Sequence, residues 1–332
     1  LRVRQSPPWD GMKPPDCSMG DFTYLSEDVL LLVAEVCSTP LAPKALCHLA
    51  AASRQTLTIL RPRLTELRAF RAEAEALCSK ELYNTTRSEL AGIDELYWYT
   101  DVTPPFGSYS TGNPCGLTTA ELTVLGRLLQ SKSLPCLEKL YLDGNQIDDH
   151  GIAALMHSLG NGPRNHARGE GESAREVTLP NLKVLSLKNN RFGGEGAQSL
   201  FSATAVMPNL CQLYLMSNRV NDTGMSALAS TIANGALPNL AHLDLDSNVI
   251  EDEGIKSFSS AISSGHSLAK LEHLSLNRNQ IGNEGMRALA LALAGGALPA
   301  LVRAFMRDNP GETAPVKVAC ACRQPTTALY CT

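Results

Sequence analysis

The chain has 332 residues, of which 44% are hydrophobic and 19% are charged, a balance typical of globular proteins. A formal net charge of -4 at pH 7 disfavours a nucleic-acid partner, because nucleic-acid-binding proteins usually carry a strong basic excess. No apolar run approaches the roughly 18 residues of a membrane-spanning helix, so we expect no membrane partner.

The 10 cysteines are scattered singly apart from Cys320 and Cys322, which favours reduced thiols over a secreted disulfide framework. We therefore expect a cytoplasmic or nuclear protein. The chain begins with Leu1 instead of methionine, which suggests an incomplete N-terminus.

Residues 1–24 are rich in proline and are predicted to be a disordered lead-in. Apolar residues at helical spacing then predict a small helical region over residues 25–82. Ser26 is a candidate N-cap, followed by Glu27 and Asp28 in the first turn, where the helix dipole favours acidic residues. The first apolar stripe of this region consists of Leu25, Val29, Leu30, Val33 and Val36.

Residues 83–133 begin with a stretch rich in proline and glycine and continue with apolar residues at positions 96, 98, 117, 122 and 125. We interpret this segment as a linker and an N-terminal cap. The array that follows needs such a cap, because an end repeat would otherwise expose its core.

Residues 134–309 repeat one pattern, L-x-x-L-x-L-x-x-N, which predicts a solenoid. Its asparagines are 45, 28, 30, 31 and 30 residues apart, and the long first step contains a charged, glycine-rich insertion over residues 160–176, which we expect to be an exposed loop. We expect the asparagines to be buried and to satisfy backbone groups, whereas Asn221, outside the motif, should tolerate alanine. The six motif asparagines are Asn145, Asn190, Asn218, Asn248, Asn279 and Asn309.

Three further positions recur after the first five of these asparagines: an apolar residue two places on, a glycine six places on, and a large apolar residue ten places on. The glycine suggests a close approach between helix and sheet. The whole pattern closely resembles the ribonuclease-inhibitor-like class of leucine-rich repeats. The resemblance implies an α/β fold, a right-handed solenoid with a curved parallel sheet and helices on its convex face, here preceded by the small helical region.

The third, fifth and seventh motif residues should point away from the core, onto the concave face of the sheet. Tyr141, Tyr214 and Met216 would form an apolar region there, and His242, Asp244, Asp246 and His273 a polar, acidic one. One interpretation is a binding surface for a protein partner; the other is a solvated sheet face without a selected partner. The candidate partner-binding residues are Lys139, Tyr141, Asp143, Gln212, Tyr214, Met216, His242, Asp244, Asp246, His273, Asn277, Arg303 and Phe305.

The sequence carries only weak signals of metal binding or enzymatic activity. His242 and His273 occupy the same position in adjacent repeats, but we expect exposed neighbouring histidines there and no metal site. The sequence lacks a phosphate-binding loop, a zinc-protease motif and a nucleophile elbow, which favours a non-enzymatic protein without cofactors. Residues 310–332, with Cys320, Cys322 and Cys331, are predicted to be an irregular tail.

The N-terminal helical region resembles an F-box in two segments, from Leu25 to Leu30 and from Leu46 to Arg54. It departs from that family at Ser26, where a proline is usual, and at Gln55, where a tryptophan is usual. The resemblance implies a substrate-recognition subunit of a cullin-type ubiquitin ligase, in which Val29, Leu30 and Val33 contact a Skp-type adaptor. The alternative is an ordinary helical cap.

A lesser alternative is a GTPase activator of the Ran type. Arg191 and Arg219 follow motif asparagines and are similar in place to the loop arginine of that family. The array is short for that family, so a non-enzymatic interaction scaffold remains the main hypothesis.

Overall fold

The computed structural model describes residues 69, 72–73, 94–97, 116–130, 134, 136–160, 179–264 and 268–322. The chain divides into two compact units, Leu1–Ala69 and Phe70–Thr332. The predicted lead-in, nearly all of the predicted helical region and residues 161–176 of the predicted insertion lie outside the described residues. Every strand and helix named below belongs to the second unit.

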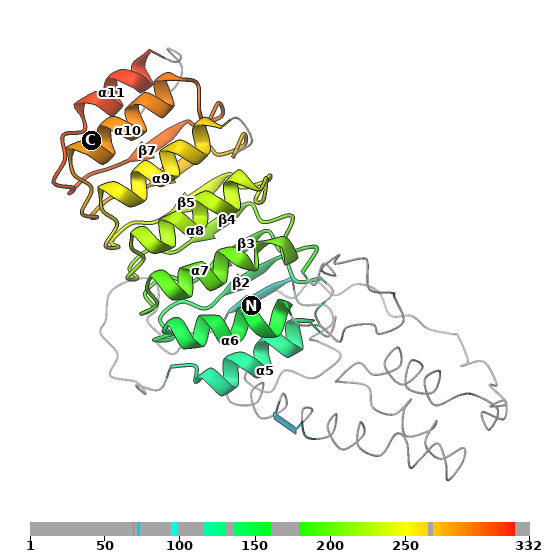
Figure 1. The fold of residues 1–332 in the computed structure, drawn as a ribbon. Coiled ribbons are helices and arrows are strands. Elements are labelled where there is room, and N and C mark those ends of the chain that lie inside the picture. The colour runs from blue at the N-terminus through cyan, green and yellow to red at the C-terminus, as the bar shows by residue number, and fades with distance from the viewer. Residues whose placement is uncertain are drawn as a thin grey trace, which may run out of the picture. The chain divides into compact units, whose positions relative to one another are not determined.

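The second unit is built on one parallel sheet whose seven described strands follow the order of the chain (Figure 1). Each strand is three residues long, and neighbours pair so that the motif's fourth residues align, as Leu213 does with Leu243. The strands are β1 (Glu95–Tyr97), β2 (Lys139–Tyr141), β3 (Val184–Ser186), β4 (Gln212–Tyr214), β5 (His242–Asp244), β6 (His273–Ser275) and β7 (Arg303–Phe305).

A helix follows each of the seven described strands, and the helices stack side by side along one face of the sheet (Figure 1). This alternation confirms the predicted leucine-rich-repeat solenoid. The helices are α5 (Thr119–Gln130), α6 (Asp149–Gly160), α7 (Gly194–Ser202), the short 3-10 helix η2 (Thr204–Val206), α8 (Asp222–Ala233), α9 (Asp252–Ser263), α10 (Asn283–Ala294) and α11 (Ala314–Ala321). In the described ranges, none is long and apolar enough to span a bilayer.

The motif leucines form the core between the sheet and the helices. In the repeat that begins at Leu240, the leucines at the first, fourth and sixth motif positions are all fully buried. Ile250 and Phe258, at the two recurring apolar positions of the same repeat, are also fully buried. The register read from the sequence is therefore confirmed.

From Asn190 to Asn309, the motif asparagines connect each repeat with the one before it. The Asn248 amide nitrogen donates to the carbonyl oxygens of Leu245 at 3.1 Å and of Leu215 at 3.0 Å. The Asn248 Oδ1 accepts a hydrogen bond from the backbone N–H of Val220 at 2.9 Å. Asn190, Asn279 and Asn309 make the corresponding donor and acceptor bonds. Asn218 makes the donor bonds, but its Oδ1 has no hydrogen-bond partner among the described residues.

The recurring glycine was predicted to allow a close approach between helix and sheet. In the structure, the close contact at Gly285 is with the neighbouring helix instead. A Cβ at Gly285 would lie 2.7 Å from Asp252 Oδ1 and 3.2 Å from the Asp252 Cα, at the start of the preceding helix α9. That carboxylate accepts hydrogen bonds from the backbone N–H groups of Gly282 and Gly285, both at 2.7 Å. Helix contacts helix at this position, and the aspartate caps the N-terminus of its neighbour.

The prediction of an irregular tail over residues 310–332 is wrong in its first half. Helix α11 occupies Ala314–Ala321 and packs against α10. Val316, Ala319 and Cys320 are buried along one side of it, at the spacing of an amphipathic helix. Pro310 and Gly311, which precede this helix, suggested a loop in the sequence. The helix packs on α10 and so covers the end of the last repeat. Residues 323–332 lie outside the described part of the chain.

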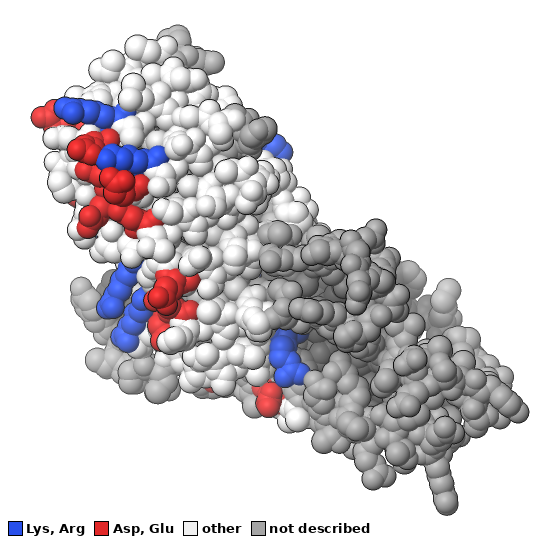
Figure 2. Space-filling view, in the orientation of Figure 1, with Lys and Arg blue, Asp and Glu red and all other residues white. Residues whose placement is uncertain are grey.

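On the helix side, Lys256 of α9 connects carboxylates of α9 and α10 through ion pairs. Lys256 forms ion pairs with Glu284 and, at 2.9 Å, with Glu253. Hydrogen bonds to these two carboxylates raise the pKa of Lys256 above its ordinary value. Figure 2 shows basic and acidic side chains side by side on this surface, amid largely uncharged residues.

Candidate functional site: the sheet face

The candidate site is the face of the sheet that points away from the helices, here called the sheet face. It consists of the side chains at the third, fifth and seventh motif positions. In β4, the buried Leu213 lies between Gln212 and Tyr214, both half-buried on the sheet face. The pleat of a strand turns alternate side chains to opposite sides, so this placement follows from the register.

Four side chains of the sheet face form a continuous row across β3 to β6, here called the ring row: Lys188, Tyr214, His242 and His273. The rings of His242 and His273 stack with centroids 4.7 Å apart, and the rings of Tyr214 and His242 are 5.3 Å apart. Lys188 Nζ lies 4.1 Å from the centre of the Tyr214 ring. Sequence reasoning selected the three rings but left Lys188 out of the binding residues. Its seventh motif position is the signal that could have included it.

Burial and neighbouring charges keep the middle of the ring row neutral. Burial lowers the pKa of His242 below its ordinary value of 6.5, and His273, Lys188 and Arg303 lower it further. Burial likewise raises the pKa of Tyr214. The Tyr214 hydroxyl donates a hydrogen bond to Gln212 Oε1 at 3.0 Å, which fixes the direction of the ring. Tyr214 and His242 therefore present uncharged ring faces in the middle of the row.

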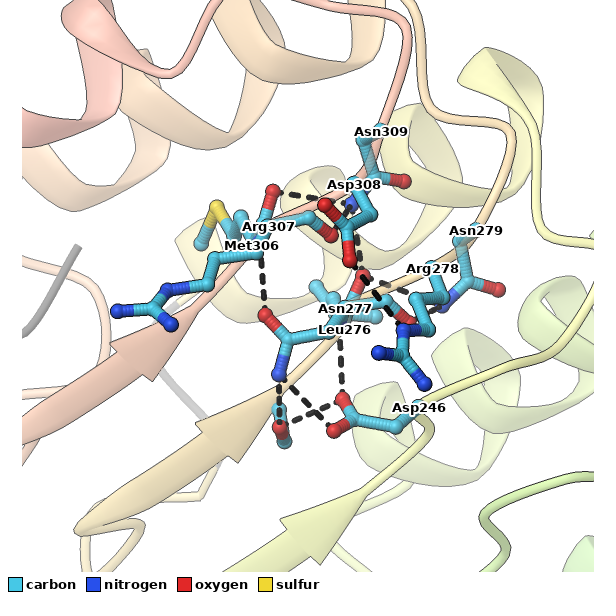
Figure 3. A network of polar contacts seen from close by, with 10 residues as sticks. Asp246, Leu276, Asn277, Arg278, Asn279, Met306, Arg307, Asp308 and Asn309 are labelled. Atoms are coloured by element: carbon cyan, nitrogen blue, oxygen red, sulfur yellow. Dashed lines mark hydrogen bonds and ion pairs between the residues drawn. The ribbon is translucent and has the colours of Figure 1, made fainter. Parts of the chain in front are cut away.

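The predicted acidic region is not presented to solvent as expected. Asp244 is only 9% exposed, and its Oδ1 accepts a hydrogen bond from the backbone N–H of Asp246 at 3.1 Å. Asp246 Oδ1 accepts from the Ser275 hydroxyl and from the Asn277 N–H, and its Oδ2 accepts from the Asn277 amide (Figure 3). These carboxylates are occupied within the protein, because the strands bring their partners into reach.

Two other predicted binding residues, Asp143 and Asn277, also form hydrogen bonds with the next strand. Asp143 Oδ1 accepts from the Ser186 hydroxyl at 2.6 Å and from the Lys188 N–H at 2.8 Å. Asn277 Oδ1 accepts from the Arg307 N–H at 2.7 Å (Figure 3). Each seventh-position acceptor thus caps the end of the next strand, a structural role that the sequence reasoning missed.

The remaining predicted residues are distributed over the rest of the sheet face. Lys139 forms an ion pair with Glu95, and Tyr141 is half-buried beside it on β2. Met216 and Phe305 are half-buried, whereas Arg303 is exposed. In the part of the chain that the structure describes, no group of three or more His, Cys, Asp or Glu is placed to hold a metal. Arg191 and Arg219 are exposed in their loops.

Replacing Asp244 with asparagine is expected to stabilise the protein at pH 7. Burial raises the pKa of Asp244 above its ordinary value of 3.8, so the folded protein pays for keeping this carboxylate charged. The asparagine oxygen can still accept from Asp246. We expect a Tm increase of roughly 2–4 °C, the shift that about 1 kcal/mol gives in a domain of this size.

The pH dependence checks this cause. Below pH 3.8 the aspartate is protonated in both the folded and the unfolded state, so the advantage of Asp244→Asn should disappear there. Scanning calorimetry of both proteins from pH 7 to pH 3 measures this. An equal Tm difference across that range would show that the charge of Asp244 is not the cause.

Comparison with known proteins agrees with this repeat organisation. The sequence model of the leucine-rich repeat matches residues 133–156, 178–201, 206–229, 236–259 and 267–290. A search of curated proteins with this sequence found no match.

Three solved structures are similar to this chain at 18% sequence identity. The complex of TLR13 with ssRNA13 matches over 70% of this chain and 28% of that chain, with a TM-score of 0.35. A Leptospira interrogans LRR protein matches over 63% and 56%, with a TM-score of 0.29. An internalin from Listeria monocytogenes matches over 77% and 93%, with a TM-score of 0.24. The chain thus spans less than two thirds of the first two of these proteins.

Proposed function

Because residues 133–290 carry leucine-rich repeats, we propose that this protein is an interaction scaffold that binds a protein partner on the sheet face. Repeats of this kind stack into an extended surface on which many side chains are displayed at a constant spacing. The observation that carries the proposal is the ring row, in which large ring faces lie together and stay partly accessible.

The ring row has the properties of an interface anchor. Tyr214 offers a large apolar area and a polar tip, and its hydrogen bond to Gln212 restricts the side chain before a partner arrives. Little conformational entropy is then lost on binding, which favours affinity. Lys188 and Met216 are the seventh motif residues after β3 and β4, and their side chains offer no acceptor to the next strand. This part of the face is therefore not occupied by the internal capping seen at Asp246.

Tyr214→Ala tests the proposal. We expect it to weaken partner binding by at least about 2 kcal/mol, roughly 30-fold, if Tyr214 is a central anchor. The measurement is the Kd of a partner recovered by affinity capture, determined by titration with the purified protein. Arg287→Ala, an exposed residue on helix α10, is the matched control and should leave the Kd unchanged.

The opposite result for the two variants would contradict the assignment of the binding site to the sheet face. A partner that is lost with Arg287→Ala and retained with Tyr214→Ala binds the helices and not the sheet face. Circular dichroism of each variant before titration separates a lost contact from a lost fold.

The role in a ubiquitin ligase stays a prediction from sequence, because Val29, Leu30 and Val33 lie outside the described residues. If it is correct, the protein should capture a Skp-type adaptor, and Val29→Asp combined with Leu30→Asp should abolish that capture while the repeats stay folded. A wild-type protein that captures no adaptor would leave the helical cap as the interpretation.

A further inference from the structure

Two kinds of side-chain acceptor bond connect successive repeats beyond the ends of the strands. In the first kind, the Oδ1 of a motif asparagine accepts from a backbone N–H of the repeat before it, as Asn248 accepts from Val220. In the second kind, the first residue of one helix accepts from N–H groups near the start of the next helix, as Asp252 does from Gly282 and Gly285. Both kinds are present at four junctions: α6–α7, α8–α9, α9–α10 and α10–α11.

In the described part of the chain, the junction between α7 and α8 has neither kind of bond. Asn218 Oδ1 is buried and accepts no hydrogen bond, although Phe192 occupies the place that Val220 has in the next repeat. Helix α7 begins with Gly194, where α6, α8 and α9 begin with aspartate, so its first residue offers no acceptor to α8. Helix α8 is capped from within its own repeat instead, by Asn221, whose Oδ1 would lie 2.2 Å from a Cβ at Gly194.

Helix α7 is itself irregular. It has nine residues, whereas α6 and α8 on either side of it have twelve, and the short 3-10 helix η2 follows where they continue. Hydrogen bonds in a 3-10 helix have poorer geometry than those in an α-helix. The strand pairing of β3 with β4 and the buried leucines are the same here as at the other junctions. This junction is therefore packed like its neighbours but held by fewer hydrogen bonds.

We propose that the junction between α7 and α8 is a hinge, at which the array opens first into one part that ends with η2 and another that begins with β4. In a repeat protein each repeat contacts mainly its neighbours, so the array separates where the interface between two repeats is weakest. Two absent bonds make this interface weaker than those on either side of it. Opening exposes the N–H groups of Leu187 and Asn189, which donate to Tyr214 and Met216 in the closed array.

The hinge crosses the ring row, which gives it a consequence for binding. Lys188 and Tyr214 lie on opposite sides of the junction, with the Lys188 Nζ 4.1 Å from the centre of the Tyr214 ring. Opening separates these two side chains, so a partner that covers both of them holds the array closed. This consequence rests on the proposed function, whereas the hinge itself requires no partner.

Hydrogen exchange of the full-length protein, resolved to single amides, tests the hinge without a partner. We expect the protection factors of Leu187 and Asn189 to be at least tenfold lower than those of Leu245 and Ser247, the equivalent amides between β5 and β6. Fraying from the ends would give the reverse order, because among the described helices the α7–α8 junction lies closer to the middle of the array than the α9–α10 junction. Equal or higher protection at Leu187 and Asn189 would overturn the hinge.

A repaired junction tests the cause. Gly194→Asp combined with Asn221→Ala gives α7 the first residue of its neighbours and removes the side chain that would collide with it. The new carboxylate takes the place that Asp252 has toward α10 and can accept from the N–H groups at the start of α8. We expect exchange at Leu187 and Asn189 to slow by about tenfold, since opening now breaks additional bonds.

The matched control is Gly194→Ala combined with Asn221→Ala, which adds the same Cβ without a carboxylate. It should show no such slowing, because the cap of α8 is lost and not replaced. If it slows exchange at Leu187 and Asn189 as much as the aspartate variant does, the absent bonds are not the cause and the inference is overturned. If the hinge amides behave as expected while Tyr214→Ala leaves partner binding intact, the hinge stands and the proposed function is wrong.

Discussion

Asn248→Ala is expected to lower the free energy of unfolding by about 3 kcal/mol or more. The side chain is 5% exposed and bonds to the carbonyl oxygens of Leu215 and Leu245 and to the N–H of Val220. Alanine leaves these backbone groups buried without partners, and each buried unsatisfied group costs about 1–3 kcal/mol. Chemical denaturation followed by circular dichroism measures the loss.

Three further variants test the cause of that loss. Asn218→Ala should cost less, because Asn218 Oδ1 has no partner among the described residues. Asn221→Ala, expected from sequence to be silent, should cost about 1 kcal/mol, because Asn221 is the N-cap of α8 and accepts from the N–H groups of Thr223 and Gly224. Gln280→Ala, exposed beside Asn279, should be neutral. Equal stabilities for all four proteins would refute the role of the motif asparagines.

Gly285→Ala is expected to be nearly as damaging, at about 2–3 kcal/mol. The added methyl group would lie 2.7 Å from Asp252 Oδ1 and 2.9 Å from Ile281 Cγ2, and the backbone of α9 stands 3.2 Å away. Relief requires α9 and α10 to separate or Asp252 to withdraw from the N–H groups that it caps. Overpacking costs about 1–3 kcal/mol, and a lost cap adds about 1 kcal/mol. The midpoint of thermal unfolding reports the change.

Gly295→Ala, at the C-cap of the same helix, is the matched control. The nearest atoms to a Cβ at Gly295 are the carbonyl oxygens of Leu291 and Ala292, both 3.4 Å away, and the backbone has φ -72°. Alanine fits there, so its Tm should stay close to that of the unmodified protein. A Tm loss at Gly295 as large as that at Gly285 would mean that close contact with Asp252 is not the reason for the glycine.

The repeat motif predicted the fold well because its signal is local and repeated. A misassigned position in one repeat would disagree with the other five copies, so Leu243, Asn248 and Phe258 could be placed from sequence alone. The contacts between repeats follow from this placement, since each repeat mainly touches its neighbours.

The chemistry of the sheet face could not be predicted in the same way. Asp246 and Asp244 both occupy outward positions in the motif, yet one is bonded to the next strand and the other is buried. Their state depends on which side chains stand beside them, as Ser275 and Asn277 do for Asp246. Helix α11 escaped detection because a helix of eight residues gives a weak periodic signal between Pro310 and the tail cysteines.

The asparagine bonds also determine how the array could change in length. From Asn190 to Asn309, each motif asparagine donates hydrogen bonds to its own turn and to the repeat before it, so successive repeats present the same groups to one another. Removing or duplicating one complete unit of about 30 residues, for example from the start of β5 to the residue before β6, would join equivalent surfaces and leave the bonding pattern whole. Cuts at other intervals would leave unpaired backbone groups inside the core. Gain or loss of surface by whole repeats is thus the route to new partners that this architecture leaves open to evolution.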